Sequence, residues 1–110
     1  MAYVIKINSH KVIEEHQSEA MVEALQYLIK EHDLLENISL PYTMQKKALL
    51  NTSPVHPNDT EMGQYAVLAE DLYLNVDLPG RTKVNQLKNL ANICDVVVTF
   101  ENWPDYSRKQ

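Results

Sequence analysis

The sequence predicts an α+β protein, built as a two-layer sandwich in which a mixed sheet of four to five strands carries two amphipathic helices on one face. Residues 2–8 alternate between apolar and polar side chains, as a half-buried strand does. Two separate segments, one before residue 36 and one after residue 81, repeat apolar residues at helical spacing. Short runs of β-favouring residues lie between and after them. The predicted order is therefore β-α-(β)-β-β-α-β.

The totals are those of an ordinary globular domain, with 110 residues, 45% apolar and 23% charged. We expect one domain over residues 1–106 and a polar tail at 107–110. No apolar run approaches the ~18 residues of a membrane span, and no secretory signal is evident. The single cysteine, Cys94, cannot form an intrachain disulfide and is expected in the core. These features predict a cytoplasmic protein with no membrane partner.

The first helix is predicted up to about residue 35, with Met21, Leu25 and Leu28 on one face. Residues 14–19 (EEHQSE) hold no apolar side chain, so residues 10–35 form either one helix or two segments, the second starting near Ser18. One helix packed on the sheet is the default expectation.

A strand followed by two helices also begins a ribbon–helix–helix DNA-binding dimer, whose strand enters the major groove. This segment fits that arrangement poorly, because the first helix would be very short and the break contains no glycine.

The middle of the chain is predicted to be β-rich. Residues 46–52 (KKALLNT) form a strand or a short helical turn, and residues 53–59 form a loop with two prolines. Residues 64–69 (QYAVLA) and 72–78 (LYLNVDL) are typical of a hairpin. A connector over 37–42, ending in Leu40-Pro41, joins this part to the first helix.

The last third is predicted to contain a helix and a strand. The helix begins after Thr82 and buries Val84, Leu87 and Cys94. The run VVVTF at 96–100 is typical of a central strand that is buried on both faces.

No catalytic or metal-binding signature is present. The four histidines are too widely spaced for a typical metal site, and no serine lies in a G-x-S-x-G turn. Phosphate-binding glycine loops are absent, since the chain has two isolated glycines. We therefore predict a protein that is not an enzyme, with no catalytic residue, metal, cofactor or small-molecule substrate.

Charge is distributed unevenly along the chain. The formal net charge is −5, yet five cations and only three acids follow residue 77. An acidic body disfavours non-specific nucleic-acid binding, whereas a basic edge on such a body can bind a polyanion. The basic segment at the predicted start of the second helix is therefore a candidate for such a binding site.

The candidate anion site is the helix start after a Pro-Gly turn. Gly80 would supply a positive φ, Thr82 would cap the helix, and Arg81 and Lys83 would lie where ordinary helices place acids. A bound phosphate would make these cations favourable, although a plain capped helix with solvated cations is the alternative. The predicted nucleic-acid or anion-binding residues are Gly80, Arg81, Thr82, Lys83, Asn85, Gln86 and Lys88.

These observations predict a small non-enzymatic DNA-binding or regulatory protein that contacts phosphates through residues 79–88, with a homodimer or another protein as a possible partner. Tyr73, Trp103 and Tyr106 are candidates to edge the same surface and stack on bases, and the alternative for Trp103 is that it closes the end of the core. The alternative is a protein-interaction module or inhibitor whose acidic first helix engages a basic, nucleic-acid-binding partner. That surface would consist of Glu14, Glu15, Glu19 and Glu23.

Overall fold

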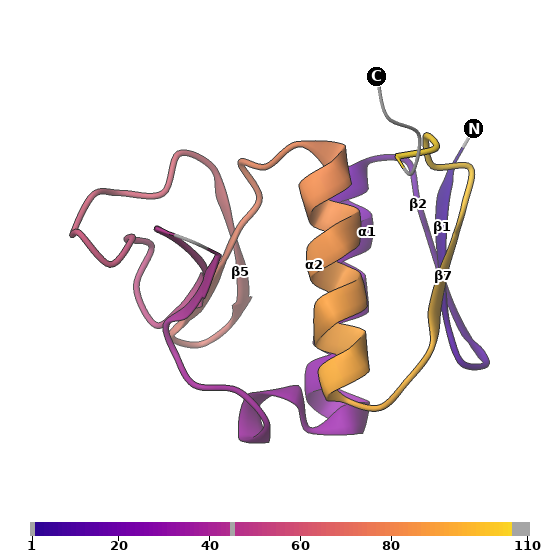
Figure 1. Ribbon diagram of the computed structural model, residues 1–110, viewed down its shortest axis with the longest axis horizontal. Helices are drawn as coiled ribbons and strands as arrows, with labels where there is room; N and C mark the ends of the chain where they lie inside the picture. Colours follow the sequence, from indigo (N-terminus) through magenta and orange to yellow (C-terminus); the bar gives the residue numbers. More distant parts are fainter. Residues whose placement is uncertain (1, 45, 107–110) are drawn as a thin grey trace.

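The structure is a computed structural model that describes residues 2–44 and 46–106. It contains a three-stranded sheet, a four-stranded sheet and two α-helices between them (Figure 1). The elements in chain order are β1 (Tyr3–Ile7), β2 (His10–Glu14), α1 (Gln17–His32), the 3-10 helix η1 (Leu34–Glu36), β3 (Tyr42–Met44), β4 (Lys47–Asn51), β5 (Tyr65–Ala69), β6 (Leu72–Asn75), α2 (Gly80–Ile93) and β7 (Val98–Glu101).

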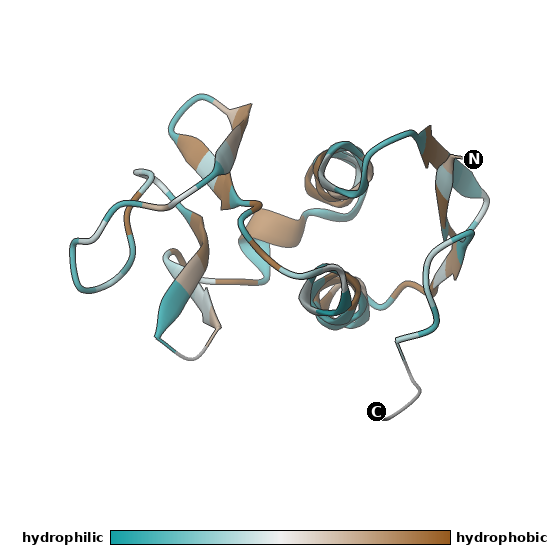
Figure 2. Ribbon diagram, turned by 90° about the horizontal axis from the view of Figure 1, so that it is seen from above, coloured by the Kyte–Doolittle hydropathy of each residue, from teal (hydrophilic) through white to brown (hydrophobic). Residues whose placement is uncertain are grey.

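The α+β class is confirmed, but the arrangement of the strands differs from the prediction. Instead of one mixed sheet there are two sheets, sheet A with order β2-β1-β7 and sheet B with order β3-β4-β6-β5. The strand pairs in the described part of the chain are antiparallel. Figure 2 shows the two helices end-on between the sheets, so the layers are sheet, helices and sheet. The predicted tail at 107–110 lies outside the described residues.

Sheet A pairs the first and last strands of the described chain. The predicted strand at 2–8 is confirmed as β1, which turns the fully buried Ile5 and Ile7 towards the helices. On its other face Lys6 forms an exposed ion pair with Glu101 at 2.9 Å. The strand β2 was not predicted, because Asn8 and Ser9 have the composition of a helix cap. Asn8 instead adopts a φ of 54° in a hairpin turn.

Helix α1 confirms the predicted apolar face, but a single helix over residues 10–35 is wrong. The helix begins at Gln17, inside the polar segment 14–19, and ends before Asp33, which has a left-handed φ of 52°. The residues it buries are Ala20, Met21, Ala24, Leu25 and Leu28.

Sheet B confirms a strand within 46–52 and the predicted hairpin, here β4 and the pair β5–β6. The short strand β3 was not predicted. The loop 52–64 folds over sheet B, where Met62 is buried and the His56 Nδ1 accepts a hydrogen bond from the Ala48 N–H at 3.1 Å. Asn75 is only 2% exposed, and its side chain donates a hydrogen bond to the Ala48 carbonyl at 3.3 Å and accepts one from the Asp77 N–H at 3.0 Å.

Helix α2 starts earlier than predicted. Its N-cap is Pro79, and Thr82 is the third residue inside the helix, so Thr82 is not the cap. Neither of the two glycines has a positive φ, so the predicted role of Gly80 in a left-handed turn is also wrong. The buried stripe of Val84 and Leu87 is confirmed, while Cys94 lies just beyond the helix and is half-buried.

Strand β7 lies at an edge of sheet A, which corrects the prediction of a central strand buried on both faces. Val97, just before it, is 70% exposed. The apolar run VVV resembles a core strand in sequence, but a three-stranded sheet with one open face cannot cover both of its sides.

Leu34 and Leu35 provide a matched test of this core, since they are neighbours in η1 with opposite environments. Leu34 is fully buried and Leu35 is 37% exposed. Leu34→Ala should lower the free energy of unfolding by about 2–5 kcal/mol, because it leaves a cavity. Leu35→Ala should lower it by less than about 1 kcal/mol. Urea denaturation measures both, and equal losses would contradict the placement of Leu34.

Candidate nucleic-acid interface

The exposed face of α2 is rich in cations and amides. The helix carries three cations, Arg81, Lys83 and Lys88, and no Asp or Glu. Its exposed positions carry mainly charged and amide side chains and fall on one side of the helix by their spacing. Helix α2 lies in front of α1 in Figure 1. These exposed residues are Arg81, Asn85, Lys88, Asn89, Asn92 and the apolar Ile93.

Lys83 is not on this face. Only 6% of the residue is exposed, and its Nζ donates a hydrogen bond to the Leu78 carbonyl at 2.6 Å. Desolvation lowers the pKa of Lys83 below its ordinary value, and the charge of Asp77 opposes this effect. The side chain therefore tethers the turn before α2 and is turned away from any bound phosphate.

Gly80 is required for close packing. A Cβ at this position would collide with the Tyr106 hydroxyl, which also accepts a hydrogen bond from Gln17 Nε2 at 3.1 Å. The start of α2 is thus braced by α1 and by the segment after β7. Of the predicted first-turn residues, Arg81 is exposed and Thr82 is half-buried.

A groove of about 690 Å³ lies between α2 and the beginning of β4, and we call it the lysine groove. Three predicted residues, Thr82, Asn85 and Gln86, line its helix side. Lys46 and Lys47 line the opposite side, although the sequence pattern does not connect them with α2. The adjacent lysines between two β-type runs were the available signal. The remaining lining residues are Met44, Asp77, Leu78 and Pro79.

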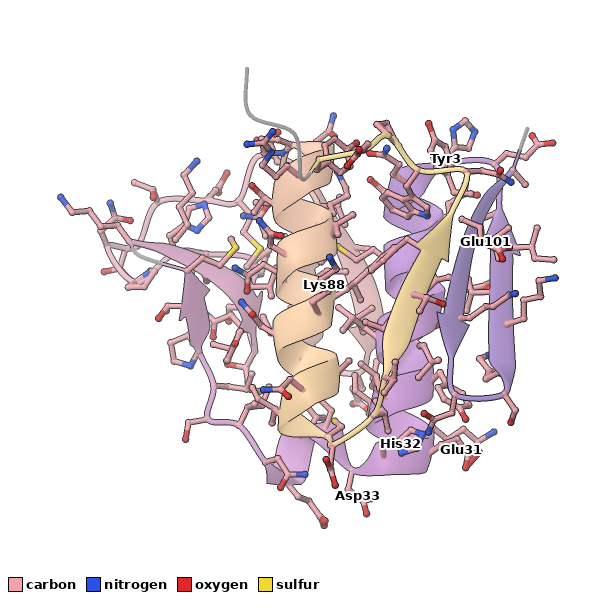
Figure 3. All side chains as sticks on the ribbon, turned by 45° about the vertical axis from the view of Figure 1, so that its right-hand side comes forward. Tyr3, Glu31, His32, Asp33, Lys88 and Glu101 are labelled. Carbon is pink, nitrogen blue, oxygen red and sulfur yellow. The ribbon has the colours of Figure 1, made fainter. Side chains whose placement is uncertain are left out.

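A second groove, of about 520 Å³, lies on the other side of α2, between this helix and β7 with the segment that follows it. We call it the aromatic groove. Lys88 lies on the side of α2 facing β7 (Figure 3), with its Nζ 5.9 Å from the centre of the Phe100 ring. Asn85 lines both grooves. The aromatic groove is lined by Val84, Asn85, Lys88, Val98, Thr99, Phe100, Trp103, Pro104, Asp105 and Tyr106.

The fold brings two of the three predicted aromatic residues to α2. Trp103 and Tyr106 both line the aromatic groove. Tyr73 does not, because it belongs to sheet B and packs edge-on against Tyr65, with 5.5 Å between the ring centres. Phe100 was not predicted as a surface aromatic, because it belongs to an apolar run that is typical of a core strand.

On the α1 side, a groove of about 370 Å³ gathers Glu14, Glu19 and Glu23, and we call it the acidic groove. The pKa of Glu14 is raised, first because its carboxyl shares a hydrogen bond with Glu23, and then by desolvation and by the negative charge of Glu23. Glu15, the fourth predicted acid, is exposed but does not line the groove. The rest of the lining is Ser18, Val22, Ala66 and Val76.

Among residues 2–44 and 46–106, no three His, Cys, Asp or Glu side chains gather as a metal site, and no helix is long and apolar enough to cross a membrane. Burial raises the pKa of the Cys94 thiol, and the negative charge of Asp33 raises it further. The raised pKa disfavours the nucleophilic thiolate.

Comparison with family models, curated proteins and solved structures found no match to this chain.

The burial of Lys83 predicts a pH dependence of stability. Because its pKa is lowered in the folded state, the folded protein releases this proton before the unfolded chain does as pH rises towards 10.5, the ordinary value. Burial of the charged Lys83 ammonium carries its full free-energy cost at neutral pH, and this cost disappears at high pH, where the amine is neutral. The stability of the wild type relative to Lys83→Met should therefore rise from about pH 7 to about pH 10.

Urea denaturation at several pH values measures this difference. Lys30→Met, at an exposed position of α1, controls for the loss of a lysine as such. A difference between wild type and Lys83→Met that stays constant or falls with pH would contradict the assigned environment of Lys83.

Proposed function

We propose that this protein binds nucleic acid through the exposed face of α2 and the grooves on either side of it. The observation that carries the proposal is the grouping of Lys88 with Lys46 and Lys47 around an amide-rich helix that has no acidic residue. Phosphate contacts come mainly from Lys and Arg, whereas Asn and Gln side chains can both donate to and accept from base edges.

The rest of the molecule supports one binding orientation. The two helices lie on opposite sides of the middle layer (Figures 1 and 2), and no residue of α2 lines the acidic groove. With a net charge of −5, the protein repels phosphates over most of its surface and attracts them at α2. This arrangement favours a non-enzymatic, regulatory protein that engages its target through one face.

The phosphate contacts in this proposal differ from those expected at the helix start. Lys83 is tethered to Leu78 and is withdrawn from the surface. Lys46 and Lys47 take its place, since they are exposed and lie across the groove from Thr82 and Asn85.

Removal of two groove charges tests the proposal. In Lys46→Ala/Lys47→Ala, binding to a mixed-sequence oligonucleotide should weaken, and the slope of log affinity against log salt should become shallower by about one for each phosphate that a lysine no longer neutralises. Lys11→Ala/Lys30→Ala removes the same charge from positions outside both grooves and should retain binding and its salt slope. Fluorescence anisotropy at several salt concentrations measures both. Equal affinities for the two double variants would count against the site.

The acidic groove favours a second candidate function, an interaction module or inhibitor that engages a basic partner. Glu14 from β2 and Glu19 and Glu23 from α1 line this groove together with the apolar side chains of Val22, Ala66 and Val76. The repulsion between Glu14 and Glu23 would be relieved by a cationic side chain of a partner. An acidic surface of this kind imitates the phosphates that a nucleic-acid-binding partner recognises.

An oligolysine peptide is the probe for this candidate. Glu19→Lys/Glu23→Lys should abolish binding of the peptide because the attraction becomes repulsion, while the circular dichroism spectrum stays unchanged. Glu61→Lys/Glu70→Lys reverses two exposed charges outside the groove and should still bind. Peptide binding that both double variants share would indicate general attraction to an acidic protein and no site at α1.

A further inference from the structure

We infer that the aromatic groove holds an unpaired base of a single-stranded nucleic acid, stacked on Trp103, so that the protein binds single strands in preference to duplex. This inference rests on the proposed function and specifies the class of its ligand. Trp103 and Phe100 are the only tryptophan and the only phenylalanine of the chain, and both line this one groove together with Tyr106. Aromatic side chains in a surface groove beside a cation are the usual platform for unpaired bases.

The ring of Trp103 is held in position by contacts within the protein. Asn102 has a φ of 67°, which turns the chain after β7, and its Nδ2 donates a hydrogen bond to the Ala2 carbonyl at 3.0 Å. Trp103 then packs edge-on against Tyr3 and Phe100, with 5.1 Å and 5.4 Å between the ring centres. A ring fixed on two sides loses little conformational entropy when a base stacks on it.

The lining of the groove favours a base inside it. Six of its ten lining residues are aromatic or apolar, and Asp105 also lines it. Lys88 lies on the helix side, where its ammonium can meet the backbone of a bound strand. Since Asn85 lines both grooves, a strand can pass over it from the aromatic groove to Lys46 and Lys47 in the lysine groove.

The position of α2 disfavours a duplex. A recognition helix must protrude to enter the major groove, as in helix-turn-helix proteins. Here α2 has a groove on each flank, with Lys46 and Lys47 across one and Trp103 across the other. Paired bases present only their edges in a groove, whereas a single strand can insert a whole base.

Trp103 is also a direct reporter, because it is the single tryptophan of the chain. The experiment titrates the wild-type protein with a single-stranded oligonucleotide of about 12 nucleotides, with the matching duplex, with a mononucleotide and with inorganic phosphate. The single strand should quench the tryptophan fluorescence saturably. The duplex should bind at least about tenfold more weakly and leave the emission unchanged, because its bases remain paired.

Variants of Trp103 then separate base stacking from general electrostatic attraction to the nucleic acid. Trp103→Leu should weaken single-strand binding about tenfold or more in anisotropy, whereas Trp103→Phe keeps a ring and should retain most of the affinity. Tyr65→Leu alters an exposed aromatic residue of sheet B outside the groove and serves as the control. Thermal denaturation of each variant checks that the fold is intact, and the wild-type quenching result stands whether or not Trp103→Leu folds.

The outcomes distinguish the two proposals. Equal affinity for single strand and duplex, without quenching, would overturn this inference and leave the proposed nucleic-acid face intact. Quenching by the mononucleotide with the affinity of the oligonucleotide would also overturn it, in favour of a free-nucleotide site. Failure of every nucleic acid to bind would overturn both proposals.

Discussion

The two helices share one apolar core with both sheets, and the layout of the surface follows from that sharing. Leu28 of α1 and Leu90 of α2 are fully buried in the same cluster as Ile5 of sheet A and Leu74 of sheet B. Each such side chain contributes about 1.5–3 kcal/mol when it is removed from water. Because both sheets press on the same pair of helices, each helix keeps only a strip of its surface open to solvent, and the two strips lie on opposite sides.

This layering separates the charges of the protein in space. The acids near the start of α1 meet at one side of the middle layer, while the cations and amides of α2 occupy the other. The grooves beside α2 follow from the same geometry, because the sheets extend past the helix and leave a hollow on each flank. A two-layer protein with both helices on one face would have placed the acidic and basic strips side by side, where they would neutralise each other.

The burial of Lys83 illustrates how packing overrides a local electrostatic argument. In sequence, Arg81 and Lys83 look equivalent, since both lie at a helix start that ordinarily prefers acids. The helical period of 3.6 residues turns them to different sides, so that Arg81 is exposed and Lys83 points into the protein. The Leu78 carbonyl satisfies the buried ammonium, and that hydrogen bond replaces the phosphate contact expected of this residue.

Features that depend on near neighbours along the chain are predictable from the sequence. The strand at 2–8, the apolar face of α1, the hairpin of β5 and β6 and the buried stripe of α2 were all predictable, because their periodicity is local. Only the folded chain shows that the strands form two sheets, that Lys46 and Lys47 line a groove against α2 and that Trp103 and Lys88 line a common groove. These contacts join residues that are distant along the chain, and no local pattern records which apolar surfaces will meet once the core is assembled.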